Sequence, residues 1–137
     1  MITRDEREVQ KAFERAVFNV LFHNRDDHPK NLAFRLDAQR HWKLAPCFDL
    51  TYSQGPGGEH QMDVCGEGLD IQRSHLMQLA QTGGLDARWA AQRLDGMLGV
   101  VDQWRELVSE FDIRQATVRA LDQAVQKQRS RLSIRAF

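Results

Sequence analysis

The sequence predicts a mainly α-helical domain that carries one small antiparallel β hairpin, and three observations support this fold class. Apolar residues recur every three or four positions near the start of the chain and through most of its second half, which is typical of the buried face of amphipathic helices. Two short segments, residues 32–36 and 41–45, instead alternate around a polar turn at residues 37–40, as paired strands do. At 137 residues the chain can bury one substantial core, so we expect a single domain over residues 1–137.

The first element is a helix that leads into a polar loop. Thr3 and Glu6 have the spacing of a capping box, so we expect the helix to start there and to run to about Leu21 or His23. Its apolar stripe consists of Val9, Phe13, Ala16, Val17, Val20 and Leu21. The helix and the first strand hold the loop of residues 24–31 between two buried elements, where charged side chains can be kept in a defined geometry.

In the hairpin that follows the loop, we expect Trp42 and Leu44 to face the core. Residues 51–60 are rich in Ser, Gln, Pro and Gly and predict a further loop. Within it, residues 55–58 are expected to form a turn, because they lack the strand-loop-helix setting of a phosphate-binding loop. A brief strand is expected at residues 60–64.

The second half of the chain is predicted to form three helices. Ser74 is the expected N-cap of a short helix that the glycine pair at residues 83–84 terminates. Asp86 is the expected N-cap of a long helix, and Asp112 caps the last helix with Gln115 as its capping-box partner. The inward positions are Leu76, Leu79 and Ala80 in the first of these helices, Ala90, Leu94, Met97, Leu98, Val101, Trp104 and Val108 in the second, and Leu121, Ala124, Val125 and Leu132 in the third. The basic last turns complement the helix dipole.

Composition excludes several classes of protein. Lys and Arg together number 19, as do Asp and Glu, and a net charge of zero argues against direct nonspecific binding of nucleic acid. No segment approaches the roughly 20 apolar residues of a membrane span, and the polar start does not resemble a signal peptide, so we expect a cytoplasmic protein without membrane contact. Cys47 and Cys65 form no C-x-x-C pair and are expected to behave as small hydrophobic residues.

The loop at residues 24–31 carries groups that phosphoryl transfer needs. This reaction requires a carboxylate that orients or deprotonates the acceptor hydroxyl, and oxygen ligands that hold magnesium on the phosphates. Asp26 would face the hydroxyl, Asn31 would bind a metal through its side-chain carbonyl, and Asp49 would bridge the metal to the nucleotide phosphates. The spacing of five residues from Asp26 to Asn31 equals that of the kinase catalytic loop, H-R-D-x-x-x-x-N, and Asp49 takes the place of the D-F-G aspartate.

The joint pattern is similar to that of a known family. The motif N-x-D-x-H-x-K-N at residues 24–31, a hairpin, and L-A-P-x-F-D-L at residues 44–50 together resemble the carboxy-terminal domain of HipA-like toxins. That family consists of bacterial serine/threonine protein kinases from toxin-antitoxin systems, with a fold related to the phosphoinositide kinases. The resemblance implies that the chain is the C-terminal, helical lobe of a protein-kinase-like fold.

The resemblance also implies a role for each residue of the motif. Asp26 is similar in position to the family's catalytic aspartate, and Asn31 and Asp49 are similar to its metal-binding residues, so these three form the expected catalytic set. His28 and Lys30 match the loop pattern and are expected to lie against the phosphates. ATP and magnesium are the implied cofactors, a protein hydroxyl is the substrate, and a DNA-binding antitoxin that restrains the kinase is a partner.

One part of an intact kinase has no counterpart in this sequence. No Gly-rich phosphate loop precedes residue 24, and a two-lobed kinase does not fit in 137 residues. We therefore expect the N-terminal nucleotide-binding lobe to be absent from this chain, which would be a truncated fragment or one subunit of a split kinase. Apolar surface that this lobe would bury is expected to be exposed, which favours self-association or docking to a partner chain.

Other interpretations stay open at this point. The loop is also close to the H-x-D-x-H-x-x-N pattern of aminoglycoside and choline kinases, although Lys30-Asn31 and the L-A-P segment favour the HipA-like family. A noncatalytic interaction module that retains the loop by descent is a second alternative, and a metal-dependent phosphohydrolase that uses Asp26, Asp27 and His28 is a third. Asp26 and Asp27 could also simply cap a turn. The remaining histidines are expected to supply surface or interface polarity: His23, His41, His60 and His75.

Overall fold

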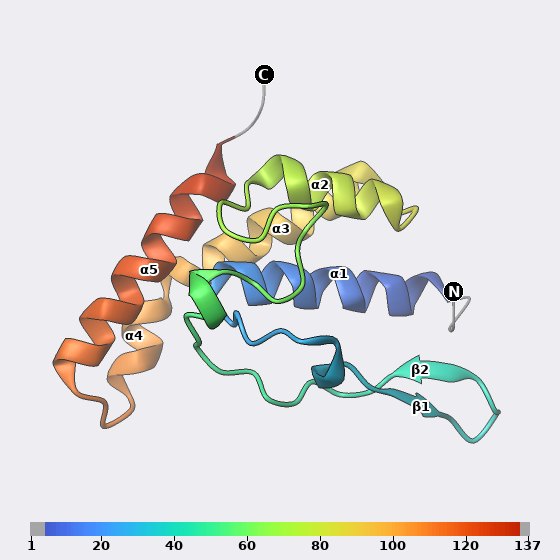
Figure 1. Ribbon diagram of the computed structural model, residues 1–137, viewed down its shortest axis with the longest axis horizontal. Helices are drawn as coiled ribbons and strands as arrows, with labels where there is room; N and C mark the ends of the chain where they lie inside the picture. The colour runs from blue at the N-terminus through green and yellow to red at the C-terminus, as the bar shows by residue number, and fades with distance from the viewer. Residues whose placement is uncertain (1–4, 135–137) are drawn as a thin grey trace.

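The computed structural model describes residues 5–134, and these form five α-helices and one two-stranded antiparallel hairpin (Figure 1). The helices are α1 (Glu6–Leu21), α2 (Arg73–Thr82), α3 (Ala87–Asp102), α4 (Trp104–Ser109) and α5 (Gln115–Ser133); the strands are β1 (Phe34–Leu36) and β2 (Trp42–Leu44); two 3-10 turns, η1 (Pro29–Asn31) and η2 (Pro56–Gly58), lie in the loops. The predicted fold class, mainly α with one antiparallel hairpin, is confirmed.

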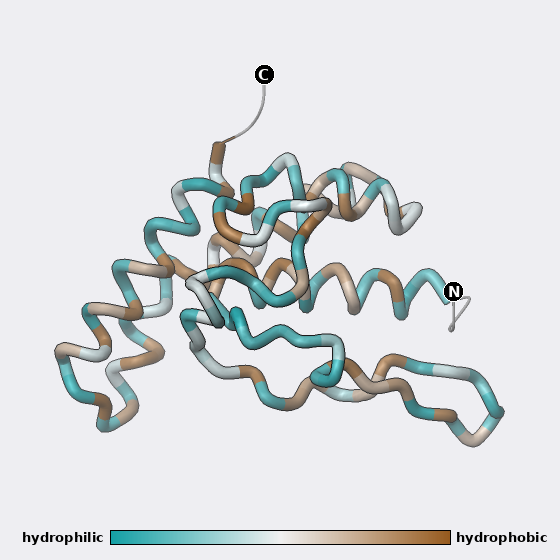
Figure 2. Tube along the Cα trace, viewed as in Figure 1, coloured by the Kyte–Doolittle hydropathy of each residue, from teal (hydrophilic) through white to brown (hydrophobic). Residues whose placement is uncertain are grey.

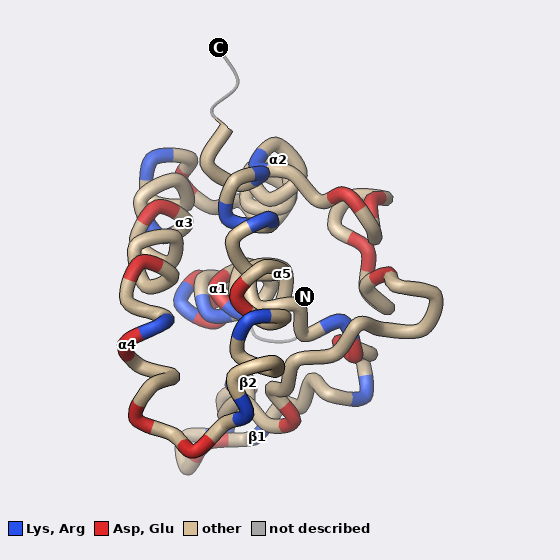
Figure 3. Tube along the Cα trace, turned by 90° about the vertical axis from the view of Figure 1, so that its left-hand side faces the viewer, with Lys and Arg blue, Asp and Glu red and all other residues tan. Residues whose placement is uncertain are grey.

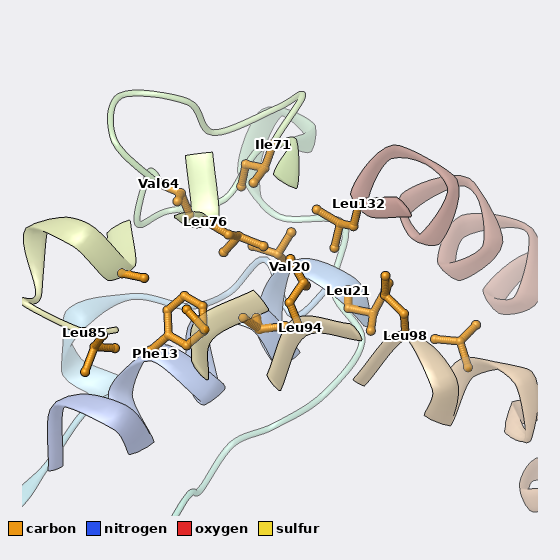
Figure 4. Close-up of a cluster of buried hydrophobic side chains, with 14 of the residues drawn as sticks. Phe13, Val20, Leu21, Val64, Ile71, Leu76, Leu85, Leu94, Leu98 and Leu132 are labelled. Carbon is orange, nitrogen blue, oxygen red and sulfur yellow. The ribbon is translucent and has the colours of Figure 1, made fainter. Parts of the chain in front are cut away.

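The helices form one body around α1, which packs against α2, α3 and α5 (Figure 1). Side chains from these four helices meet in a single apolar cluster, and Val64 and Ile71 from the preceding loop complete it (Figure 4). Leu21, at the end of α1, is fully buried in this cluster. Because burying one leucine contributes about 1.5–3 kcal/mol, the cluster fixes the point at which the polar loop begins.

The start of α1 differs from the prediction. Asp5 is the N-cap, and its carboxylate accepts a hydrogen bond from the backbone N–H of Arg7. Thr3, which was expected to cap this helix, lies outside the described residues. The predicted apolar stripe is otherwise confirmed, with Phe13 and Val17 in the core.

The hairpin is attached to α1 along β2 (Figure 1). The backbone N–H of Leu44 donates to the buried carboxylate of Glu8 at 2.6 Å, and the Lys43 ammonium lies 2.7 Å from the Asp5 carboxylate. These contacts occupy the outer edge of β2, so α1 fixes the position of the strand that leads toward Asp49.

The prediction for Trp42 is wrong, although the hairpin itself is confirmed. Phe34 pairs with Leu44 and Leu36 pairs with Trp42, so all four side chains share one face of the hairpin. Of these four side chains only Leu44 is buried, whereas Trp42 is 46% exposed and Phe34 and Leu36 are exposed as well. The hairpin thus carries hydrophobic positions outside the helical body (Figure 2). The alternation of apolar residues correctly predicts that these side chains share one face of the hairpin. Whether that face is buried depends on how far the helices extend over it.

The segment after the second loop is not the strand expected at residues 60–64. Its contact with neighbouring backbone is an isolated bridge between Val64 and Glu67, and His60 donates its backbone N–H to the carbonyl of Gly68 at 2.9 Å. The turn expected at residues 55–58 is present as η2.

Three helix boundaries in the second half also differ. Gln72 replaces Ser74 as the N-cap of α2, because the side chains of Gln72 and His75 form a reciprocal capping box. The long helix predicted from Asp86 does begin there, but it breaks at Gln103 into α3 and α4. At this break Trp104 packs on Phe22, with 5.7 Å between ring centroids. This tertiary contact coincides with the end of α3, although the apolar spacing of the sequence continues through it.

The predicted N-cap of the last helix, Asp112, is also wrong. Arg114 takes this position in α5, without a capping hydrogen bond from its side chain. The basic residues near the end of α5 are paired, since Arg129 lies 2.8 Å from Asp102 and Arg131 lies 2.6 Å from Asp70. Acidic and basic positions are both present along α3, α4 and α5 (Figure 3). None of the helices within residues 5–134 combines the length and the hydropathy required to cross a lipid bilayer.

Candidate active site

The loop after α1 is tied to two other parts of the chain as soon as it leaves the helix. The side-chain amide of Asn24 donates to Asn19 at 3.0 Å, and Asn24 forms a parallel bridge with Ser53. The backbone N–H of Ser53 donates to the carbonyl of His23 at 2.8 Å. The segment that carries Asp26 and the segment that follows Asp49 therefore run side by side.

Asp26 and Asn31 are brought together by the 3-10 turn η1. The Asn31 side-chain Nδ2 donates to the backbone carbonyl of Asp26 at 2.8 Å. The turn itself is capped by His28, whose Nδ1 accepts the backbone N–H of Lys30 at 3.1 Å. With its nitrogen engaged, the Asn31 carboxamide presents Oδ1 as a free acceptor, which is the atom that a metal would use.

Asp49 lies in the loop between β2 and η2, next to this turn. Its neighbours Cys47, Phe48 and Leu50 line a cavity of about 20 Å³. The same cavity is lined from the first loop by Asn24, Asp27, His28 and Asn31. Two segments separated by a hairpin thus meet at one small polar space, as expected from the sequence pattern.

The backbone at Asp49 is held in an uncommon conformation. Its φ of 55° lies in the left-handed region, and its exposed carboxylate makes no hydrogen bond or ion pair with any of residues 5–134. Such conformations cost of order 1 kcal/mol and cluster at functional sites. The approach to Asp49 is fixed from α1, because the Arg15 guanidinium donates to the carbonyl of Ala45.

The two residues expected to face the phosphates are placed differently from each other. His28 is exposed and lines the cavity beside Asn31. Lys30 is also exposed, but it is not among the residues that line this cavity, and it forms no ion pair within the described part of the chain. The structure thus brings Asp26, His28, Asn31 and the segment around Asp49 together, and leaves the Lys30 ammonium at the rim.

The donor set fits a magnesium ion held largely by phosphates and water. Within residues 5–134 no three His, Cys, Asp or Glu side chains gather closely enough to hold a metal by themselves. A kinase-type site needs fewer protein ligands, because phosphate oxygens and water complete the coordination of magnesium. Asn31 Oδ1 and the Asp49 carboxylate would be the two protein ligands in such a site, and neither makes a hydrogen bond or ion pair with another described residue.

Comparison with known proteins identifies the family of this domain. The family model for the HipA-like C-terminal domain matches residues 1–104, which contain α1, the hairpin, both loops of the site, α2 and α3. The chain belongs to this family. The match ends at Trp104, so most of α4 and all of α5 lie outside it. The search of curated proteins found no match to this chain.

Sequence analysis missed a second carboxylate site in this HipA-like domain. The sequence suggests a turn cap or a phosphohydrolase residue for Asp27 and surface or interface polarity for His60, but both side chains are buried and lie 2.9 Å apart. The other oxygen of Asp27 accepts the backbone N–H groups of Gln61 at 2.8 Å and Met62 at 3.2 Å. The side-chain amide of Gln61 donates to Oδ1 of Asp26. No spacing rule connects residues 33 to 35 positions apart, so no signal in the sequence could have shown these contacts.

His23 of the HipA-like domain is likewise buried, contrary to the sequence-based expectation. It stacks on Tyr52, with 6.1 Å between ring centroids, and lies beside the backbone of Ala124 in α5. Burial, together with the positive charge of Arg25, lowers the pKa of His23 to about 4. Its Nε2 and the Oδ1 of Asn24 are buried without hydrogen-bond partners in the described structure. His23 is thus a neutral, buried side chain that packs between the loop at residues 24–31 and α5.

Proposed function

We propose that this chain supplies the catalytic and metal-binding part of an ATP-dependent serine/threonine protein kinase. Membership of the HipA-like family relates the domain to the kinases of toxin-antitoxin systems. The transfer of the ATP γ-phosphate to a protein hydroxyl, in the cytoplasm where ATP is abundant, is the finer assignment that we propose. An antitoxin that represses transcription is the partner that the family suggests.

A single observation supports the proposal most strongly. Asn31, which is hydrogen-bonded to the carbonyl of Asp26, lines the same cavity as Phe48 and Leu50, the two neighbours of Asp49, although a hairpin separates the two segments in sequence. A turn-capping role would account for Asp26 alone, but it gives no reason for an exposed Asp49 in a left-handed conformation next to this cavity. A shared metal-nucleotide site accounts for all three residues.

In this proposal each residue has a distinct task. Asp26 accepts a hydrogen bond from the serine or threonine hydroxyl and orients it for in-line attack. Asn31 and Asp49 would hold magnesium, which supplies charge neutralisation on the phosphates of ATP when it is bound. His28 lies where its free ring nitrogen could face a phosphate, and Lys30 brings a positive charge to the rim.

Kinases also have a second lobe that covers the nucleotide above this site, and exposed apolar side chains of this chain support such a partner. Six large apolar side chains, all within residues 34–52, are at least 39% exposed: Phe34, Leu36, Trp42, Phe48, Leu50 and Tyr52. They lie on the hairpin and on the loop that contains Asp49. Exposed apolar side chains grouped in one segment of a chain favour an interaction site, so we propose that the nucleotide-binding lobe, from this or another polypeptide, covers them.

Calorimetric titration with ATP tests the proposed function. The purified chain should bind ATP weakly and only with magnesium, and Asp49→Asn should weaken that binding at least tenfold. Asp112→Asn is the matched control, because Asp112 is an exposed aspartate outside the lining of the cavity, and this variant should bind like the wild type. Equal binding by wild type and Asp49→Asn, or an absence of magnesium-dependent binding, would contradict the proposal.

A further inference from the structure

We infer that Gln61 is a positioning residue for Asp26, and that a buried clamp between Asp27 and His60 holds Gln61 in place. The hydrogen bond between Gln61 and Asp26 is observed in the structure. The catalytic role that we infer for it rests on the proposed kinase function.

In this clamp, both oxygens of the Asp27 carboxylate contact the segment at residues 60–62. The Asp27 and His60 side chains are only 5% and 3% exposed, and their Oδ2 and Nδ1 atoms lie 2.9 Å apart. Oδ1 of Asp27 accepts two consecutive backbone N–H groups, from Gln61 and Met62. Hydrogen bonds to a charged group are stronger than those between neutral groups, so these contacts hold the segment against the loop that carries Asp26.

A second set of contacts holds the same two segments together on the other side. The Arg25 guanidinium donates to the carbonyl of Gly58 at 2.5 Å. Gly55 packs so closely on this loop that a Cβ atom there would lie 2.8 Å from the Cβ of Arg25 and 2.2 Å from the carbonyl oxygen of Glu59. Residues 25–27 and 55–62 therefore behave as one unit, and the side chain of Gln61 is presented from a fixed backbone.

The Gln61 side chain uses this position to contact Asp26. Its Nε2 donates to Oδ1 of Asp26, which leaves Oδ2 as the oxygen that can accept the hydroxyl proton of a substrate. The backbone of Asp26 is fixed separately, by the carboxamide of Asn31. A carboxamide neither carries charge nor takes up a proton near neutral pH, so Gln61 orients the carboxylate without replacing it as a base.

The segment at residues 59–62 thus links two neighbouring aspartates with different tasks. Asp27 holds the segment, and the segment in turn holds the side chain of Asp26. Loss of Gln61 would free the Asp26 carboxylate to rotate, and misplaced catalytic groups cost one to two orders of magnitude in rate. Because Gln61 is exposed, its replacement is expected to leave the fold intact.

The first arm of the test measures the contact without any need for activity. The side-chain amide protons of Gln61, followed by ¹⁵N NMR in the full chain at neutral pH, should exchange with water more slowly than those of the exposed Gln81. This protection should be lost in Asp26→Ala and reduced in His60→Gln, which loosens the clamp. Equal exchange rates for Gln61 and Gln81, or protection that persists in Asp26→Ala, would overturn the inference.

The second arm measures the role by transfer of γ-³²P from ATP to dephosphorylated casein, a generic acceptor protein. Gln61→Ala and Gln61→Asn, whose side chain is one methylene shorter, should lower kcat about tenfold and leave the KM for ATP within twofold. Gln81→Ala is the matched control, since Gln81 is an exposed glutamine on α2 outside the site, and it should leave kcat unchanged.

The outcomes separate the two proposals. Equal kcat for wild type and Gln61→Ala would overturn the positioning role and leave the kinase proposal standing. An absence of transfer by the wild type would overturn the kinase proposal and, with it, the catalytic meaning of Gln61, whereas the NMR arm would still decide whether the contact exists.

Discussion

Two neighbouring carboxylates in the loop after α1 have opposite environments. Asp26 is partly exposed and accepts one side-chain hydrogen bond, from Gln61, whereas Asp27 is 5% exposed and accepts three hydrogen bonds from the segment at residues 60–62. The Asp26 carboxylate is therefore accessible to a substrate, whereas the Asp27 carboxylate is occupied by hydrogen bonds within the fold. This difference separates a catalytic candidate from a structural residue one position away.

Substitution of these two aspartates should therefore affect stability unequally. Asp27→Asn removes the charge that His60 and two backbone N–H groups contact, and should lower the free energy of unfolding by about 2–4 kcal/mol. Asp26→Asn should lower it by less than about 1 kcal/mol, because its side chain is partly exposed. Urea unfolding followed by circular dichroism measures both values. Equal losses would show that Asp27 is not the anchor described above.

His23 makes stability depend on pH in the mildly acidic range. Its pKa is lowered from 6.5 to about 4 in the folded chain, so between these values the unfolded chain binds the proton and the folded chain does not. The contribution of His23 is thus fully present above pH 6.5 and is lost as the pH falls toward 4, by up to about 3 kcal/mol.

The variant His23→Asn isolates this effect. Asparagine tolerates the left-handed conformation of residue 23, whose φ is 53°, but it does not titrate. Thermal unfolding at pH 6.5 and pH 5 should differ less in this variant than in the wild type. The control is His41→Asn, which removes an exposed histidine at the hairpin turn and should keep the wild-type pH dependence. The same pH dependence in His23→Asn and the wild type would refute the assignment.

At the scale of elements, one buried carboxylate joins the hairpin to α1. Glu8 is 4% exposed, and a hydrogen bond from Lys11 together with the backbone N–H of Leu44 holds the pKa of Glu8 below its usual value. Glu8→Gln removes the charge from both contacts and should destabilise the chain by about 1–3 kcal/mol. Hydrogen exchange at the Leu44 amide should accelerate in the same variant. Glu6→Gln, on the exposed side of α1, is the control and should change neither quantity.

The turn η2 provides a second test at this scale. Gly55 adopts a φ of 73° with backbone and side-chain atoms in the space of a Cβ, whereas Gly57 adopts a φ of 69° with nothing within 4 Å. Gly55→Ala should therefore cost more than Gly57→Ala, which carries only the backbone strain of about 1 kcal/mol. Denaturant midpoints of the two variants give the comparison. Equal midpoints would mean that the turn does not pack on the catalytic loop as described.

Local patterns in the sequence predict most of the elements. Apolar spacing predicts α1, α2 and α3, alternation predicts the hairpin, and Asp86 is the N-cap that its position suggests. Features that depend on contacts distant in sequence are not predicted. Trp42 is exposed because the helices do not extend over it, and the long helix breaks at Gln103 because Trp104 packs on Phe22.

The candidate site divides in the same way. The spacing of Asp26 and Asn31 and the segment around Asp49 could be recognised from the sequence, because each motif is local. Asp27, His60 and Gln61 could not, because their hydrogen bonds join positions more than 30 residues apart and both partners have common structural roles. The uncommon backbone conformation of Asp49 has no sequence signal either.

At the scale of the whole molecule, a buried helical core lies beside a hairpin and a loop that carry exposed apolar side chains. In the core around α1, Leu76, Leu94 and Leu132 are fully buried. The hairpin and the Asp49 loop carry exposed aromatic and aliphatic side chains beside the polar cavity, and further apolar side chains are exposed on α3 and α4 and at Phe111. In the proposed kinase the core holds the catalytic loops, and the hairpin and the Asp49 loop receive the nucleotide-binding lobe.

The account depends most on the location of the metal-nucleotide complex. Mn²⁺ and ATP, added to the ¹⁵N-labelled chain, should broaden the amide signals of residues 24–31 and 47–51 more than all others, because a paramagnetic ion broadens signals near its own site. Asp49→Asn should remove this selective broadening. Broadening centred elsewhere, for example between α2 and the end of α5, or broadening that persists unchanged in Asp49→Asn, would contradict the account.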